Sequence, residues 1–348
     1  MRSALRGLTI ALPTLALIVS ACGGGTVSPG PATAAPAGGP TAAATVPATP
    51  VEIRFGHGTA AEEQAWLMIA KPDVTPNQGK WYTLKVTQFR ASDERLSAFE
   101  AGQLDAGTMP VATALFAADK GVPMKLMASI IRESVSPSSF KTTFLALDTS
   151  GIKSAKDLKD KTIGVVGFKT ATESWSRAAA ASAGLDPAKD IKLVVVGFPA
   201  MGEALRTKRI DVGAFPQPFY AIEKARGGVA DAYTSRTGAP YDEDNLSLMF
   251  NPDFVAKHPG VVRAFLSDFV AATKYYLANE KTARQTLIDK KFVATAPDVY
   301  LNMLDYSRPA DGKLSLDGLK KHHDELLKAG WIAKAVDLTK LVDQSFLP

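Results

Sequence analysis

The sequence predicts an α/β fold of two lobes, each a mostly parallel sheet flanked by helices, with a hinge between the lobes. Strand-type segments alternate with helix-type segments over residues 51–120, which is typical of a parallel sheet covered by helices. The same order of strand, turn and helix returns after residue 150. Residues 101–107 and 208–213 also resemble each other, because each joins a helix end, an apolar residue, an aspartate and a strand of small residues. Together these observations indicate two related lobes.

The first 21 residues are typical of a secretory signal peptide. Arg2 and Arg6 give a positive start, and residues 8–19 form an uncharged apolar run, shorter than the about 20 residues of a membrane-spanning helix. Residues 19–22 resemble the lipobox of bacterial lipoproteins, which implies a lipid anchor on Cys22. The other interpretation is an unmodified cysteine in a cleavage region. Cys22 is the only cysteine, which rules out an internal disulfide and a cysteine zinc site.

Residues 22–50 are predicted to form a tether behind the lipidated cysteine. They consist almost entirely of Gly, Ala, Pro, Thr and Ser, without charged or aromatic side chains. Such a segment cannot bury enough apolar surface to become ordered. We therefore expect an exported protein, held in the periplasm or at the outer face of the cytoplasmic membrane.

The first strand–helix module begins directly after this tether. Residues 51–55 and 84–89 alternate apolar and polar side chains and predict strands, and residues 104–108 predict a shorter one. Helices are predicted over residues 62–70, 93–101 and 111–120. The first starts with the acidic residues Glu62 and Glu63, which a helix N-terminus favours, and Gly102 ends the second.

The second module repeats this order, and a mainly helical segment follows it. Residues 162–166, 192–196 and 209–214 predict strands, and helices are expected after residues 168–171 and over residues 201–207. Asn251 and Pro252 have the cap-then-proline form of a helix start. Apolar residues at helical spacing in residues 262–270 and 316–327 predict core positions.

Residues 150–165 resemble a motif of the nitrate, aliphatic-sulfonate and taurine binding proteins of ABC importers, in which I-K-S…D-L-K-G-K leads into a buried strand. Asp160 stands where that family has a glycine. Residues 98–107, 197–211 and 215–218 resemble further elements, although Pro216 and Gln217 replace the first two residues of the family's W-E-P turn. The resemblance covers residues 51–348 and implies the type II periplasmic binding protein fold.

The resemblance also implies how the chain is divided and what it does. Residues 51–142 and 241–348 are expected to form lobe 1, and residues 143–240 lobe 2. A monomeric lipoprotein of this kind captures a small molecule between its lobes and delivers it to the permease of an ABC importer. An organic anion of sulfonate, taurine or carboxylate type is expected, while nitrate and pyrimidine precursors stay open. Catalysis, a cofactor, a metal site and nucleic-acid binding are not expected.

The ligand is expected beyond the carboxyl ends of the strands, where open α/β sheets bind their ligands. Residues 168–171 are the strongest candidate, because a helix N-terminus attracts oxyanions, and Lys169 either adds a charge or is merely solvated. Arg132 either binds the anion or forms an ion pair, and His57 either contacts the ligand or is satisfied within its loop. Glu62 and Glu63 favour a solute that also carries an amino group. The expected ligand-binding residues are His57, Gly58, Thr59, Met109, Pro110, Arg132, Phe168, Lys169, Thr170, Ala171, Phe198, Met201, Pro216 and Gln217.

Two other classes of function compete with this interpretation. Residues 56–61 match the G-x-G-x-x-A outline of a dinucleotide-binding loop, which points to an exported enzyme or dinucleotide-binding protein. The acidic residue expected at the end of the second strand is missing, because Phe89 and Arg90 lie there. A scaffold lipoprotein without a ligand is the other alternative, although a scaffold would not need paired loops at the strand ends.

Overall fold

The computed structural model describes residues 45–348. The predicted signal peptide, Cys22 and most of the predicted tether lie outside the described residues. Within the described part of the chain, no helix is both long and apolar enough to cross a membrane.

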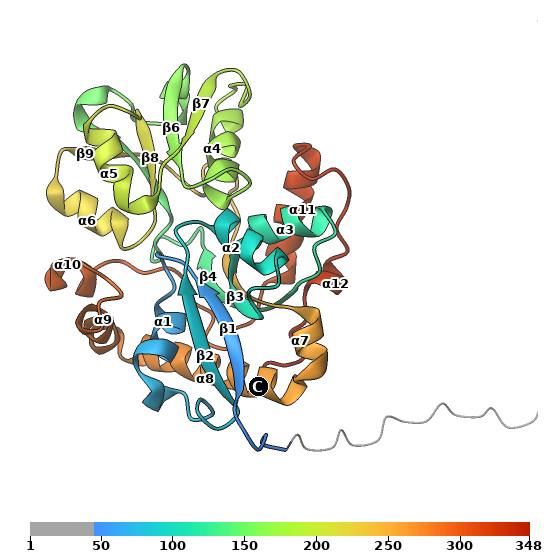
Figure 1. Cartoon of the computed structure of the whole chain (residues 1–348). Helices are drawn as coiled ribbons and strands as arrows, with labels where there is room; N and C mark the ends of the chain where they lie inside the picture. The colour runs from blue at the N-terminus through green and yellow to red at the C-terminus, as the bar shows by residue number, and fades with distance from the viewer. Residues whose placement is uncertain (1–44) are drawn as a thin grey trace, which may run out of the picture. The chain divides into compact units, whose positions relative to one another are not determined.

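The described residues contain two five-stranded sheets (Figure 1). The first has the order β2-β1-β3-β10-β4, formed by Tyr82–Gln88, Val51–His57, Ala106–Pro110, Glu243–Phe250 and Lys125–Glu133. The second has the order β7-β6-β8-β5-β9, formed by Ile191–Val195, Lys161–Val165, Val212–Phe215, Thr143–Leu147 and Val229–Thr234. The chain enters the second sheet after β4 and returns to the first at β10.

The two sheets have equivalent strand arrangements. Strand β1 pairs in parallel with β2 and β3, just as β6 pairs in parallel with β7 and β8. Strand β10 is antiparallel to β3 and β4, and β5 is antiparallel to β8 and β9. The two-lobed α/β class is confirmed, and in each sheet four of the five strands run in the same direction, while β10 in the first sheet and β5 in the second run against them. The antiparallel strands β5 and β10 each follow a crossing between sheets, and alternation of strands and helices does not predict their direction.

A pair of glycines occupies the same place in both sheets. Gly56 lies opposite Gly107 between β1 and β3, and Gly164 lies opposite Gly213 between β6 and β8. A Cβ atom on Gly107 would lie 2.5 Å from the carbonyl oxygen of Gly56, so the close approach of these strands requires glycine. A Cβ atom on Gly213 would instead meet the Met201 side chain at 2.8 Å.

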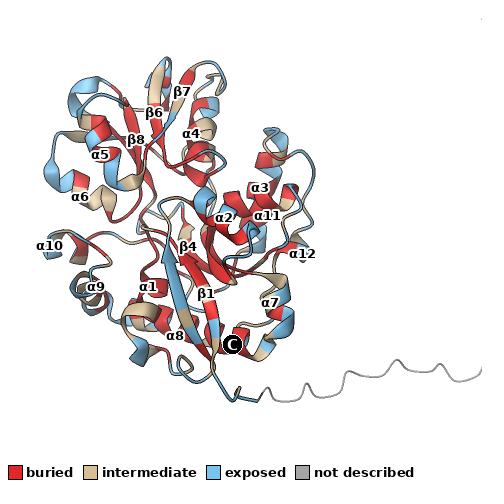
Figure 2. Ribbon diagram, in the orientation of Figure 1, coloured by how far each residue is buried: buried red, intermediate tan, exposed pale blue. Residues whose placement is uncertain are grey.

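Helices flank each sheet (Figures 1 and 2). Those that follow strands of the first sheet are α1 (Glu63–Ala70), α2 (Ser92–Glu100) and α3 (Val111–Asp119), and those that follow strands of the second are α4 (Ala171–Ser182), α5 (Phe198–Arg206) and α6 (Phe219–Arg226). The C-terminal segment adds α7 (Pro252–Lys257), α8 (Pro259–Ala278), α9 (Glu280–Asp289), α10 (Pro297–Leu301), α11 (Leu316–Lys328) and α12 (Leu338–Leu341). The side chain of Asn251 caps α7 by accepting hydrogen bonds from Asp253 and Phe254, with Pro252 at the first helical position as expected.

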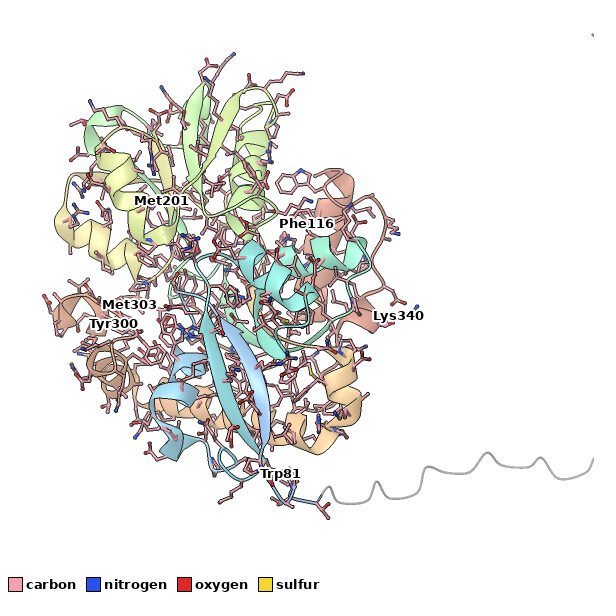
Figure 3. All side chains as sticks on the ribbon, viewed as in Figure 1. Trp81, Phe116, Met201, Tyr300, Met303 and Lys340 are labelled. Atoms are coloured by element: carbon pink, nitrogen blue, oxygen red, sulfur yellow. The ribbon has the colours of Figure 1, made fainter. Side chains whose placement is uncertain are left out.

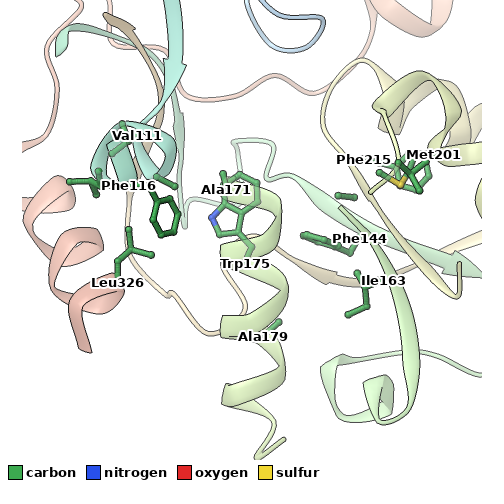
Figure 4. Packing of buried hydrophobic residues seen from close by; sticks show 14 of the residues in the cluster. Val111, Phe116, Phe144, Ile163, Ala171, Trp175, Ala179, Met201, Phe215 and Leu326 are labelled. Carbon is green, nitrogen blue, oxygen red and sulfur yellow. The ribbon is translucent and has the colours of Figure 1, made fainter. Parts of the chain in front are cut away.

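One buried hydrophobic cluster extends across both lobes. Figure 4 shows Trp175 on α4 between Phe116 of α3 and Phe144 of β5, and all three belong to this cluster. A smaller cluster packs Tyr300 and Met303 against Trp66, and Figure 3 shows Tyr300 and Met303 to the left of the first sheet. The shared cluster allows α4 of the second lobe to lie against the first lobe, which brings the strand ends of the two sheets together.

Candidate functional site

A cavity of about 90 Å³ lies where loops of the two lobes face each other. The first lobe contributes the loop after β1, the loop after β2 and the beginning of α2. The second lobe contributes Val166 after β6, the first turn of α4, and the residues Phe198 and Pro216. The parallel strands of both sheets thus end at this cavity, which is the usual position of a ligand in open α/β sheets.

Half of the residues expected to bind a ligand line the cavity. They are Gly58, Thr59, Pro110, Thr170, Ala171, Phe198 and Pro216. Strand ends and helix starts could be located from the sequence, so the loops that form the cavity walls were predictable. The remaining expected residues lie elsewhere.

Phe168 and Lys169 do not line the cavity. The Phe168 side chain is 50% exposed, and Lys169 is also exposed. Lys169 has a positive φ of 58°, so the chain turns sharply before α4. Its backbone N–H donates to the Glu173 carboxylate at 2.7 Å. The segment expected to provide the ligand's charge partner thus gives the cavity only its last residues, Thr170 and Ala171.

The hydroxyl groups at the start of α4 are already engaged. Thr170 Oγ1 donates to the Gly167 carbonyl at 2.7 Å, so its contact of 3.0 Å with Thr172 Oγ1 is donated by Thr172. Thr172 Oγ1 also accepts from the Val166 N–H at 3.1 Å. Both hydroxyl protons therefore stabilise the turn. The backbone N–H groups of the first helical turn, which have no carbonyl partner within the helix, remain for an anion.

Three expected site residues are part of the buried interior. Met109 lies in the core, and Met201 packs beneath the second sheet, where Cβ atoms on Gly164 and Gly213 would meet it. His57 is buried with its Nδ1 atom 3.0 Å from the Gly58 carbonyl. None of the three lines the cavity.

Arg132 and Gln217 hold the structure together. Arg132 Nε donates to Asp244 at 3.0 Å within the first lobe. Of the two expectations for Arg132, the structure therefore shows the ion pair. Gln217 Nε2 donates to the Leu304 carbonyl at 2.9 Å, and the Gln217 backbone N–H donates to the Tyr306 hydroxyl at 3.2 Å. Gln217 therefore links the second lobe to a segment of the first.

The loop after β1 is organised around Glu62. The Gly58 N–H donates to both carboxylate oxygens of Glu62, at 2.9 and 3.0 Å, and Thr108 Oγ1 donates to one of them at 2.9 Å. A carboxylate therefore accepts the N–H that a dinucleotide phosphate would need. This arrangement argues against the dinucleotide-binding interpretation of residues 56–61.

Arg95 is a buried charged residue of the cavity that sequence reasoning missed. It lies on α2, lines the cavity and is only 3% exposed. Its Nη1 atom is 3.7 Å from Glu62 Oε1, and burial lowers the pKa of Arg95 because the Glu62 charge only partly offsets the lost hydration. The spacing of Ser92, Arg95 and Phe99 on the buried face of α2 was the signal that could have revealed it.

A network of buried charges positions Tyr306, which also lines the cavity. Arg308 bonds to Glu63, to Gln64 at 2.5 Å and to Asp305 at 2.9 Å. These bonds join the start of α1 to the segment that carries Tyr306. The Tyr306 hydroxyl lies 3.0 Å from Thr142 Oγ1 of the first lobe and accepts from the Gln217 N–H of the second lobe, so this wall of the cavity is fixed from both lobes.

A larger cavity of about 620 Å³ lies between α4 and α11. Trp175 borders both cavities, while Tyr241 and Trp331 line only the larger one. The larger cavity lies along the sides of helices and not at strand ends. The smaller cavity is therefore the stronger candidate for the ligand site, since it combines strand-end loops with a buried charge.

Comparisons with known proteins agree with the resemblance read from the sequence. A family model described as the NMT1-like family matches residues 45–289. No curated protein matches the chain. The alkanesulfonate-binding protein from Xanthomonas axonopodis pv. citri, bound to MOPS, is similar in structure, with a TM-score of 0.69 and 18% identity over 85% of this chain and 99% of that chain.

Two other solved structures show the same fold. The periplasmic aliphatic sulphonate binding protein from Escherichia coli has a TM-score of 0.67 and 17% identity over 85% of this chain and 93% of its own. The periplasmic nitrate-binding protein from Synechocystis PCC 6803 has a TM-score of 0.69 and 11% identity over 85% and 87%. All three are described as binding proteins, and at 11%, 17% and 18% identity their likeness to this chain is one of fold.

Proposed function

Because the chain belongs to the NMT1-like family and has the fold of periplasmic solute-binding proteins, we propose that it is an exported solute-binding lipoprotein that delivers a small organic anion to an ABC importer. The observation that carries this proposal is the cavity enclosed by strand-end loops of both lobes. A solute held there contacts both lobes and favours the closed arrangement. A permease can then distinguish loaded from empty protein.

The walls of the cavity support an organic anion over an inorganic one. Phe89, Trp175 and Phe198 supply apolar surface, while Arg95 and the N-terminus of α4 supply positive charge. A sulfonate, taurine-like or carboxylate solute combines these two features. The similar structure from Xanthomonas axonopodis pv. citri holds MOPS, which is itself a sulfonate on an organic body.

A ligand screen of the purified protein tests the proposal. Thermal unfolding is followed with alkanesulfonates, taurine, short carboxylates, nitrate and pyrimidines, and each hit is titrated by calorimetry. A ligand present at a hundred times its dissociation constant stabilises the fold by about 2.7 kcal/mol. Stabilisation by one of the organic anions supports the proposal, whereas the absence of any hit contradicts it.

The lipid anchor has its own test, which rests on a cysteine outside the described residues. In cells that express the full chain, the protein should incorporate a radiolabelled fatty acid and sediment with membranes. Cys22→Ser should lose both properties, and it removes the only cysteine of the chain. Unchanged sedimentation and labelling of the variant would contradict lipidation at Cys22.

A further inference from the structure

Arg95 differs from the other buried arginines in its hydrogen bonding. Arg236 donates to Glu243 and to the Tyr241 carbonyl, Arg284 donates to Tyr276 and the Met303 carbonyl, and Arg308 donates to Glu63, Gln64 and Asp305. Within residues 45–348, no atom accepts a hydrogen bond from the Arg95 guanidinium, and its Nε is fully enclosed.

Glu62 does not satisfy the donors of Arg95. The distance of 3.7 Å from Nη1 to Oε1 is too long for a hydrogen bond, and this oxygen already accepts from Gly58 and Thr108. A desolvated cation without hydrogen-bond acceptors is unfavourable, because burial removes its hydration and the nearby Glu62 charge makes up only part of the loss. Such a group is retained where a ligand provides the acceptors.

The geometry of the first-lobe loop holds the guanidinium beside the cavity. A Cβ atom on Gly58 would lie 2.9 Å from Arg95 Nη1 and 2.6 Å from Glu62 Oε1, so the loop packs directly against both charged groups. Arg95 lines the cavity, and a molecule there can reach its unbonded N–H groups.

From these contacts we propose that Arg95 anchors the solute by a charge-assisted pair of hydrogen bonds to one oxyanion group. The proposal rests on the proposed function and narrows its ligand to a singly charged sulfonate or carboxylate on an apolar body. The negative charge of Glu62 beside Arg95 disfavours a doubly charged head group such as phosphate. Trp175 and Phe198 on the opposite lobe receive the apolar body.

The experiment compares four molecules with the same four-carbon body on the intact protein. They are butanesulfonate and butanoate, the uncharged butanamide, and butyl phosphate at pH 8, where it carries two charges. Calorimetry gives the affinity of each for the wild type, for Arg95→Gln and for Arg95→Lys. Arg263→Gln is the matched control, because Arg263 lies exposed on α8 and bonds to the Ser345 carbonyl away from the cavity.

The wild type should bind butanesulfonate or butanoate at least tenfold more tightly than butanamide and butyl phosphate. Arg95→Gln should weaken binding of the anion by about thirtyfold or more, and Arg95→Lys by about tenfold, because lysine lacks the planar pair of donors. Arg263→Gln should bind as the wild type does.

Equal binding of butanamide by the wild type overturns the role of Arg95, as does anion binding by Arg95→Gln within threefold of the wild type. Neither result contradicts solute binding itself. If Arg95→Gln does not fold, the ligand preferences of the wild type and the affinity of Arg95→Lys decide the question. Failure of the wild type to bind any solute in the four-compound set or the wider screen overturns the proposed function as well.

Discussion

The Nδ1 atom of His322 lies 2.6 Å from Oε1 of Glu243, and both side chains are buried. Glu243 begins β10, the strand on which the chain returns to the first sheet, whereas His322 belongs to α11. The other carboxylate oxygen of Glu243 accepts a hydrogen bond of 2.5 Å from Arg236, which lies on the segment that leaves the second sheet. A buried ionic cluster therefore connects the returning crossover to α11.

This cluster predicts a loss of stability in acid. Burial by itself raises the pKa of Glu243, but the charges of Arg236 and His322 outweigh burial and lower the pKa to about 2. A carboxyl with a lowered folded-state pKa stabilises the protein above its unfolded pKa, near 4.5, and that contribution disappears as the pH falls toward 2. Glu243→Gln should be less stable than the wild type at pH 7, and the difference, roughly 3 kcal/mol at most, should shrink between pH 5 and pH 2.

Urea unfolding across this pH range measures the effect. Asp317→Asn is the control, because Asp317 is an exposed residue on the same helix as His322. Its unfolding curve should follow that of the wild type. A constant difference between Glu243→Gln and the wild type at every pH would show that ionisation of Glu243 does not contribute.

The equivalent glycine pairs predict an asymmetry between the lobes. Gly107→Ala places a methyl group against the backbone of β1, which cannot move without disturbing the sheet, so a loss of about 3 kcal/mol is expected. Gly213→Ala meets the side chains of Met201 and Ile210 and no backbone atom, and because side chains can move it should cost about 1 kcal/mol. Chemical unfolding of the two variants gives both values, and an equal or reversed order would contradict the assigned clashes.

The fold could be predicted from the sequence because its information is local and repeated. Strand periodicity and helix caps, such as Asn251 before α7, located elements to within a few residues, and the match between residues 101–107 and 208–213 corresponds to equivalent strands β3 and β8. The direction of β5 and β10 was not predictable, because the sequence of a single strand does not reveal whether it pairs parallel or antiparallel with its neighbours.

The loops of the site were also predictable, but the orientation of their side chains was not. Lys169 was favoured because it stands next to a helix N-terminus, yet a turn with positive φ precedes that helix and the side chain is exposed. Arg95 lies within α2 and not next to a strand end in the sequence, and only the packing of α2 brings its side chain to the cavity. In this protein, a charged residue next to a strand end was therefore a weaker indication of a position that lines the cavity than a charged residue on the buried face of a helix.

This difference predicts that Lys169 contributes little to ligand binding. Lys169→Ala should change the affinity for the solute by less than about twofold, because an exposed charge outside the cavity is screened by solvent. Trp175→Ala should weaken binding at least about tenfold by removing a large apolar wall. Titration calorimetry with the best ligand of the screen measures both, and a large effect of Lys169→Ala would restore residues 168–171 as the anion site.

The bond between the Gln217 N–H and the Tyr306 hydroxyl predicts a change in the balance between open and closed lobes. Tyr306→Phe removes the acceptor of a buried N–H that connects the lobes, and an unsatisfied buried N–H costs about 1–3 kcal/mol. Because the open arrangement exposes this N–H to water, the variant should favour it by about tenfold or more, and the apparent ligand affinity should fall by up to the same factor. Small-angle X-ray scattering of the ligand-free protein should then give a larger radius of gyration.

Tyr300→Phe is the matched control, since the Tyr300 hydroxyl bonds to Glu63 within the first lobe, and its scattering should equal that of the wild type. An unchanged radius for Tyr306→Phe would show that this hydrogen bond does not hold the lobes together.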